Sequence, residues 1–144
     1  MKISCGFIIK SNDKILLCKP FGQYIGNDYW DIPKGMKEGS ETELQSAFRE
    51  TKEETSLDLL LVEGDISDVG RFKYSKQQKY LQIFLFESEI DLTNYYLKCD
   101  SLITEGLYVG KPEIISYDWV DIETAIQLSH KTLKKAIRKV ANWT

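Results

Sequence analysis

The segment WDIPKGMKEGSETELQSAFRETKEETSL, residues 30–57, constrains this 144-residue chain more than any other part of it. Glycine-containing turns come first, and residues 40–55 then have the spacing of a helix. Ser40 followed by Glu43 predicts a capping box with Ser40 as the N-cap. The side chains of one predicted packing face lie three or four positions apart and are Leu44, Ala47, Phe48 and Thr51. The segment therefore predicts an amphipathic helix that packs on one side.

Three glutamates crowd the end of this predicted helix. Glu50, Glu53 and Glu54 share one face, because they stand at positions i, i+3 and i+4. Repulsion at this spacing costs about 0.2–0.5 kcal/mol per pair, and the helix dipole disfavours anions near a C-terminus. A divalent cation relieves this repulsion, and several carboxylate oxygens suit Mg²⁺ or Mn²⁺. The alternative is a charged helix face exposed to solvent.

The spacing around the glutamates resembles the Nudix box, at residues 35–57 here. In that box a glycine is followed after five residues by a glutamate. Seven residues later comes Arg-Glu-U-x-Glu-Glu-x-Gly-U, in which U is bulky and apolar. The matching positions are Gly35, Glu41, Arg49, Glu50, Glu53, Glu54 and Leu57. A match of this length favours the metal-binding interpretation over the solvent-exposed one.

Two positions depart from the Nudix pattern. Thr51 stands where a bulky apolar residue is usual, and its branched methyl group still allows packing. Ser56 replaces the last glycine of the box, which would end the helix in a left-handed conformation. Because a non-glycine residue costs about 1–2 kcal/mol there, we expect Ser56 to affect local stability but to remove no metal ligand.

The rest of the chain predicts a layered α/β fold. Strands are expected at 3–10, 15–19, 68–74, 79–89 and 114–120, helices at 40–55, 122–128 and 132–140, and a loop or insertion at 91–110. The polar residues 11–14 predict a hairpin turn. Strands mixed with helices indicate α/β layers, and the resemblance implies a Nudix-type α/β/α sandwich with a central mixed β-sheet. Without a repeat or linker, residues 1–144 are expected to form one domain.

The resemblance also implies a metal-dependent hydrolase that acts on a nucleoside diphosphate linked to another group. Carried across residue by residue, the ligands of Mg²⁺ (or Mn²⁺) would be Glu50, Glu53, Glu54 and the backbone carbonyl of Gly35. Bound metal neutralises phosphate charge and lowers the pKa of the water that attacks phosphorus. Arg49 would orient the carboxylates through a bidentate pair, Glu41 would support the loop, and Glu53 or Glu54 would accept a proton from the water.

A second acidic candidate lies outside the box. The segment KPEIISYDWVDIETA places Glu113 just before the predicted strand that carries Trp119. It resembles the dinucleoside polyphosphate and RNA pyrophosphohydrolase branches, in which Pro-Glu precedes a Trp-Val strand end and a short helix. Glu113 is therefore the candidate fourth metal ligand or general base, and the alternative is an exposed loop glutamate. The other loop acids, Glu105 and Asp118, are less well placed.

Two residues indicate how a polyphosphate and an adenine would bind. Lys34, in WDIPKG, directly precedes the box glycine, as in diadenosine polyphosphate hydrolases and RNA-decapping relatives, and would contact a phosphate. Tyr74 lies seventeen positions after Leu57. Members active on diadenosine polyphosphates often have a tyrosine at this distance, and its ring can stack on adenine. The alternatives are a solvent-facing lysine and a chance tyrosine.

The polar turn at 75–78 resembles the basic and aromatic turn of the same branch. It contains Lys76, and Lys79 and Tyr80 follow it. Lys79 would meet a distal phosphate of the substrate. The alternative is an ordinary exposed hairpin tip.

Other conspicuous residues have structural interpretations. Trp30 and Trp119 are expected to pack in the core or loops, and His130 is expected to cap a helix.

The C-terminal helix has a basic face formed by Lys131, Lys134, Lys135, Arg138 and Lys139. That face is expected to be solvated, with RNA or another polyanion as the alternative partner.

Composition limits the partners and the compartment. A net charge of −3 argues against broad binding to duplex DNA or to an anionic membrane, but not against a small polyanion held through a metal. Three cysteines and one histidine form no metal-ligand pattern. We expect buried, reduced thiols in a cytoplasmic protein, a monomer or homodimer, without a signal peptide or an apolar run that spans a membrane.

The leading functional expectation is an asymmetric diadenosine tetraphosphate hydrolase that releases ATP and AMP. An RNA 5′-pyrophosphohydrolase is the closest alternative, because it shares the chemistry and the Glu113 segment. ADP-ribose hydrolysis often accompanies a proline about fifteen residues after the box, and no proline lies between Leu57 and Lys111. A non-catalytic nucleotide-binding module is the alternative of a different class.

Overall fold

The computed structural model describes residues 2–21, 29–74 and 78–143. The strands in these ranges are β1 (Lys2–Ser11), β2 (Lys14–Pro20), β3 (Lys34–Met36), β4 (Asp65–Lys73), β5 (Lys79–Ser88) and β6 (Ile114–Val120). The helices are α1 (Glu43–Thr55), α2 (Ile122–Leu128) and α3 (Lys131–Ala141), with a 3₁₀ turn at Leu59–Leu61. Residues 91–110 form the predicted loop.

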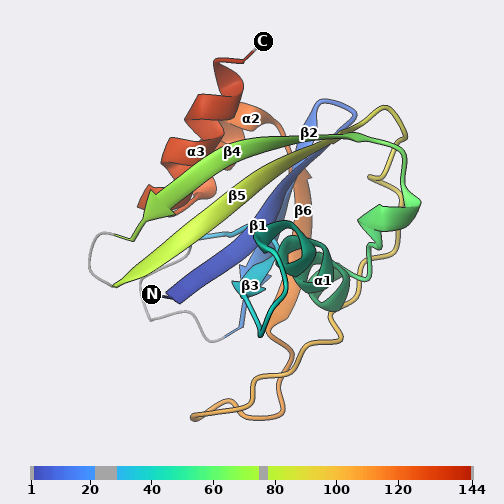
Figure 1. Ribbon diagram of the computed structural model, residues 1–144. Helices are drawn as coiled ribbons and strands as arrows, with labels where there is room; N and C mark the ends of the chain where they lie inside the picture. The colour runs from blue at the N-terminus through green and yellow to red at the C-terminus, as the bar shows by residue number, and fades with distance from the viewer. Residues whose placement is uncertain (1, 22–28, 75–77, 144) are drawn as a thin grey trace.

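The strands form one mixed sheet in the order β4-β5-β1-β2-β6 (Figure 1). β1 and β5 are parallel, and the other pairs are antiparallel. β1 changes its second partner along its length, since Ser4 pairs with Met36 of β3 whereas Lys10 pairs with Ile15 of β2. The predicted hairpin turn is confirmed, and Asn12 and Asp13 adopt positive φ values of 51° and 58° in it.

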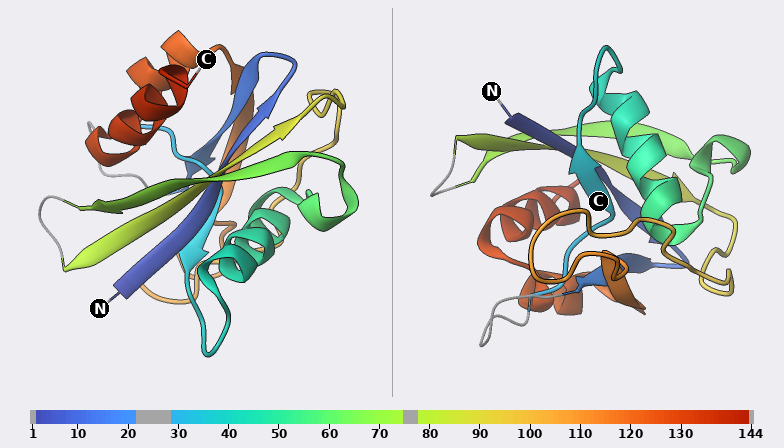
Figure 2. Two further views of the ribbon diagram at one scale, coloured as in Figure 1. Left: turned by 45° about the horizontal axis from the view of Figure 1, so that its top comes forward. Right: turned by 90° about the horizontal axis from the view of Figure 1, so that it is seen from below.

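Helices cover both faces of the sheet (Figure 2). Alternate residues of β1 face opposite layers, so Phe7 packs in the core that contains Ala47 of α1, and Ile8 in the core that contains Leu133 of α3. Burial on both faces explains the nearly continuous apolar sequence of this strand. The predicted α/β/α sandwich with a central mixed sheet is confirmed.

The predicted start of the first helix is wrong. α1 begins at Glu43, and its N-cap is Thr42 rather than Ser40. The Gln45 N–H donates to the Thr42 hydroxyl at 3.1 Å, and the Thr42 N–H donates to the Gln45 side chain at 2.8 Å. A capping box therefore exists, two residues later than predicted. The three-residue strand β3 was not predicted, because it is too short for a periodic signal.

Most predictions about single packing residues are confirmed. Trp30 and Trp119 pack against the two cores, and His130 is the N-cap of α3. Cys5 and Cys18 are buried thiols, but Cys99 is only half-buried, which corrects the expectation for that residue. No helix in the described ranges is long and apolar enough to cross a membrane.

Candidate active site

A cavity of about 550 Å³ lies where β3, α1 and the segment before β6 meet. Its lining brings together seven of the residues predicted from the sequence, namely Lys34, Gly35, Glu50, Glu53, Glu54, Lys79 and Glu113. Of the predicted site, Arg49, Tyr74 and Tyr80 are not among the described residues that line it. The alternative acids are also elsewhere, since Glu105 is in the exposed loop and Asp118 points to solvent from β6.

Gly35 is required by the close approach of two elements. β3 runs so near to α1 that a Cβ atom at Gly35 would overlap the Glu50 carboxylate. The absence of a side chain therefore lets this carboxylate lie against the strand backbone. The same approach brings the Gly35 backbone to the cavity wall, where its carbonyl was predicted to act.

Glu50 and Glu54 are buried acids whose charge is poorly compensated. Burial raises the pKa of Glu54 to about 9, although its Oε1 accepts a 2.9 Å hydrogen bond from the Lys34 N–H. Burial also raises the pKa of Glu50 to about 7, despite the nearby Arg49 guanidinium. The Glu53 carboxylate also raises the pKa of Glu50, the Glu50 carboxylate raises that of Glu54, and Glu113 adds to both shifts. The cavity wall is therefore a place where a bound cation would be stabilised.

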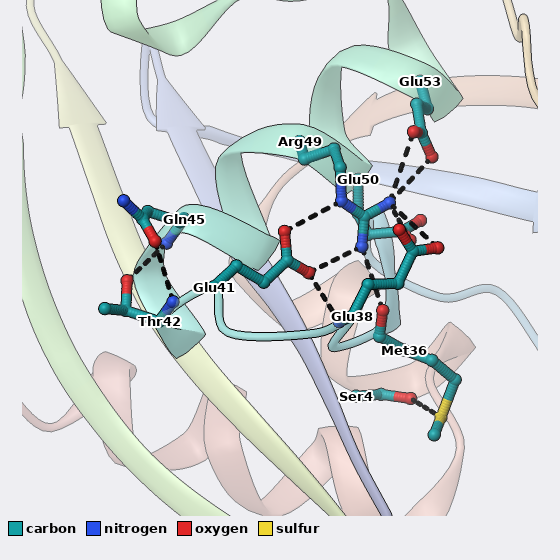
Figure 3. A network of polar contacts seen from close by, with 9 residues as sticks. All are labelled: Ser4, Met36, Glu38, Glu41, Thr42, Gln45, Arg49, Glu50 and Glu53. Carbon is teal, nitrogen blue, oxygen red and sulfur yellow. Dashed lines mark hydrogen bonds and ion pairs between the residues drawn. The ribbon is translucent and has the colours of Figure 1, made fainter.

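Arg49 joins the loop before α1 to two of the glutamates (Figure 3). Its Nε and Nη2 atoms donate to the two oxygens of Glu41 at 3.1 and 2.9 Å, and Nη2 also donates to the Met36 carbonyl. Nη1 lies 2.8 Å from Glu50 Oε1 and 3.2 Å from Glu53 Oε2. The bidentate pair is thus formed with Glu41, and Arg49 holds both glutamates from the remaining nitrogen.

The last turn of α1 is held by segments distant in the sequence. Ser56 ends the helix with a φ of 69°, and its hydroxyl donates to the Lys98 carbonyl at 2.7 Å. The carbonyls of the last turn accept from the Asp100 N–H, the Lys98 N–H and the Tyr117 hydroxyl. These bonds satisfy helix-end carbonyls that have no partner within the helix. They fix the turn that carries Glu53 and Glu54.

Asp31 is a site residue that the sequence interpretation missed. Its carboxylate lies 3.4 Å from Lys34 Nζ and 3.3 Å from His130 Nε2. Burial opposes the ionised form of Asp31, but Lys34 and His130 outweigh it and lower the pKa of the carboxyl. Asp31 in turn raises the pKa of Lys34, which therefore stays charged in the cavity wall. No spacing rule predicts this residue, because its second partner, His130, is the N-cap of α3 and lies far along the chain.

Tyr74 and Lys79 lie together at one end of the β4–β5 pair. Lys79 Nζ is 5.4 Å from the centre of the Tyr74 ring, and the Tyr74 N–H donates to the Lys79 carbonyl. The Tyr74 ring is also 6.0 Å from the His130 ring, and burial raises the pKa of its hydroxyl. Tyr80 follows Lys79 in β5, opposite Lys73 of β4. Lys76 lies outside the described residues.

The donor atoms of the cavity suit a hard divalent cation, although the carboxylates are not gathered around one point. Across the described ranges, no three acidic, histidine or cysteine side chains converge closely enough to enclose an ion. Arg49 contacts Glu50 and Glu53, and the Lys34 N–H holds Glu54. The donors offered to the cavity are oxygens, which Mg²⁺ prefers. Glu53 is 43% exposed in its side chain, so it has room to turn from Arg49 to a metal.

Comparison with known proteins agrees with the geometry. The NUDIX domain family matches residues 2–144. An RNA pyrophosphohydrolase of Hahella chejuensis is 25% identical over 92% of this chain and 90% of its own length. The asymmetrical bis(5′-nucleosyl)-tetraphosphatase of Mus musculus is 26% identical over 79% of this chain and 71% of its own.

Solved structures share the fold. A C. elegans Ap4A hydrolase has a TM-score of 0.73 at 18% identity, covering 99% of this chain and 97% of the hydrolase. A MutT protein from Methanosarcina mazei has a TM-score of 0.69 at 18% identity, covering 97% and 92% of the two chains. At this identity the likeness concerns the fold alone.

Proposed function

This chain belongs to the Nudix hydrolase family, and from that premise we propose that it hydrolyses dinucleoside polyphosphates, with diadenosine tetraphosphate giving ATP and AMP. The observation that carries the proposal is the mixed charge of one cavity. Glu50, Glu53, Glu54 and Glu113 line it together with Lys34 and Lys79. Carboxylates suit metal ions, and lysines suit phosphates that the metals leave uncovered.

Each residue has a separate task in this proposal. Nudix hydrolases generally use divalent metals such as Mg²⁺, which when bound neutralise phosphate charge and activate water. Glu50, Glu53 and Glu54 would hold the metal with the Gly35 carbonyl, and Mn²⁺ would serve in place of Mg²⁺. Arg49 would keep two of these carboxylates oriented when no metal is bound.

Proton transfer and substrate orientation fall to other side chains. Glu113 is the proposed general base or additional ligand, because it lines the same cavity as Glu50 and Glu54 and raises the pKa of both. Glu53 or Glu54 is the alternative proton acceptor. Lys34 would hold a phosphate while Asp31 keeps its ammonium in place. Lys79 would meet a distal phosphate. Tyr74 would contact the adenosine, whereas the predicted role of Tyr80 is less favoured, because Tyr80 pairs with Lys73 and alternates to the other face of the sheet.

The dinucleoside substrate is favoured by the position of Tyr74 beside Lys79 and by the relative that is named a tetraphosphatase. RNA with a 5′-triphosphate is the second candidate. It is supported by the relative named an RNA pyrophosphohydrolase and by the exposed Lys131, Lys135 and Arg138 on α3. Both substrates place a polyphosphate in the same cavity, so they differ in the group attached to it.

Product analysis with Mg²⁺ tests the proposal. Diadenosine tetraphosphate, ADP-ribose and 5′-triphosphorylated RNA would be incubated with wild type, Glu54→Gln and the control Glu89→Gln, whose exposed carboxylate lies outside the cavity. We expect ATP and AMP from the first substrate, loss of turnover in Glu54→Gln and wild-type rates in the control. Faster cleavage of RNA would move the substrate assignment to RNA. Binding without turnover of any substrate would contradict hydrolysis.

A further inference from the structure

A second recess adjoins the acidic cavity and shares a wall with it. The recess has a volume of about 380 Å³. Pro20, Thr104 and Glu113 line both hollows, so a ligand can extend from one into the other. Sites for small molecules typically have volumes of roughly 300–1,000 Å³, and this recess falls within that range.

The outer wall of the recess is a hydrogen-bonded hairpin formed by residues 101–111, which projects from the sheet in Figure 1. The Ile103 N–H donates to the Lys111 carbonyl at 2.8 Å, and the Gly110 N–H donates to the Ile103 carbonyl at 2.9 Å. At its base, the Glu113 N–H donates to the Ser101 carbonyl. The wall is therefore held together by backbone hydrogen bonds within the chain.

An aromatic pair lies between this hairpin and the end of β2. The rings of Phe21 and Tyr108 meet edge to face, with centroids 5.1 Å apart. The Phe21 N–H donates to the Glu113 carbonyl at 2.8 Å, so the Phe21 backbone is tied to the segment that carries the proposed base. Tyr108 remains 42% exposed. The pair thus offers aromatic surface next to the acidic cavity.

The charges of the two hollows differ. Lys34 and Lys79 line the acidic cavity, whereas none of the described residues lining the recess is cationic. The recess is lined by Pro20, Phe21, Ile103, Thr104, Glu105 and Glu113. Two carboxylates would repel a phosphate there. An uncharged planar group would instead gain contact with the aromatic and apolar side chains.

We infer that this recess binds the second nucleoside of a dinucleoside polyphosphate, the one at the far end of the phosphate chain from Tyr74. Phe21 supplies the stacking surface, and Tyr108 supports its ring. The inference rests on the proposed function, because it takes the polyphosphate to lie in the acidic cavity. It makes the 101–111 hairpin part of substrate recognition, outside the Nudix box.

Two ligands that differ by one nucleoside test the inference. Calorimetry would compare diadenosine tetraphosphate with adenosine 5′-tetraphosphate, in the Glu54→Gln background so that neither is consumed. Loss of one stacked base should raise the Kd for diadenosine tetraphosphate about tenfold in Phe21→Ala. The Kd for adenosine 5′-tetraphosphate should stay unchanged. Phe21→Tyr should restore affinity, and Tyr96→Ala, which removes an aromatic ring that is 85% exposed, is the control.

The outcomes separate the inference from the proposed function. Equal weakening of both ligands in Phe21→Ala, or none, overturns the inference. An increase in Kd in Phe21→Ala for a 5′-triphosphorylated dinucleotide, without an increase for diadenosine tetraphosphate, also overturns the inference. If Phe21→Ala fails to unfold cooperatively, Tyr108→Ala decides by the same comparison. If wild type cleaves neither substrate but the binding difference persists, hydrolysis fails and the recess assignment stands.

Discussion

Ser56 shows how one residue departs from a family pattern without changing the local backbone. Its φ of 69° is in the left-handed region, where a side chain costs about 1–2 kcal/mol. Its hydroxyl, however, donates to the Lys98 carbonyl at 2.7 Å. The serine therefore offsets part of its strain by tying the box helix to the segment that leads toward Glu113. A glycine at this position would have no backbone strain, but it would also lack the hydrogen bond to the Lys98 carbonyl.

Substitutions at Ser56 should separate strain from hydrogen bonding. Ser56→Ala keeps the left-handed strain and loses the bond, whereas Ser56→Gly loses both. We expect the glycine variant to be more stable than the alanine variant by about 1 kcal/mol. Urea unfolding of the two variants and wild type measures this difference. An alanine variant as stable as the glycine variant would show that the backbone at this position carries no strain.

At the level of elements, α1 and the loop before it form one electrostatic unit. The Arg49 guanidinium lowers the pKa of Glu41 to about 2, and the Glu38 N–H adds to the shift with a 2.7 Å bond. A carboxyl with a lowered pKa in the folded state stabilises the protein fully above its unfolded pKa of about 4.5. That contribution is lost as the pH falls from about 4.5 toward 2, because the unfolded chain binds the proton first.

The variant Glu41→Gln tests this linkage. It should be less stable than wild type at pH 7, and the gap in unfolding free energy should narrow as the pH falls from 5 to 3. Thermal or urea unfolding at several pH values measures the gap. A gap that stays constant over this range would mean that the Glu41 charge does not contribute to folding.

The same unit explains why the helix start was misplaced. Both Ser40-x-x-Glu43 and Thr42-x-x-Gln45 satisfy the capping pattern, so local sequence cannot choose between them. Tertiary contacts determine which residue is the N-cap. The Glu41 carboxylate accepts hydrogen bonds from Arg49 and from the Glu38 N–H, and these bonds keep the turn outside the helix. By contrast, the three- and four-residue spacings within residues 44–54 were sufficient to predict a helix and its acidic face.

At the scale of the whole molecule, metal binding at the buried carboxylates, as proposed, would link folding to metal concentration. A ligand that binds only the folded state stabilises it by about 2.7 kcal/mol at one hundred times its Kd. For a chain of this size we therefore expect Mg²⁺ to raise Tm by roughly 5–10 °C relative to EDTA. Glu54→Gln should reduce that shift and Glu89→Gln should retain it. Equal shifts in both variants would argue against a metal at Glu54.

What the sequence could not predict is the set of contacts made between distant segments. Asp31 meets His130, Ser56 meets Lys98, and Phe21 meets Tyr108, each pair separated by many residues and by no periodic pattern. The carboxylates of the box were predictable because a fixed spacing on one helix determines their common face. The residues that hold and flank them depend on how the sheet brings loops together.

The parallel pairing of β1 with β5 has a consequence for the order in which the chain acquires structure during synthesis. Lys2 pairs with Lys79 and Ser11 with Ser88. β1 therefore cannot complete its pairing in the sheet until the second half of the chain has been synthesised. Only its antiparallel pairings with β2 and β3 can form early. Closing so long a loop slows folding, and the β5 side of the apolar residues 3–9 stays unpaired meanwhile. The nascent chain should therefore resist folding on the ribosome until residue 88 has emerged.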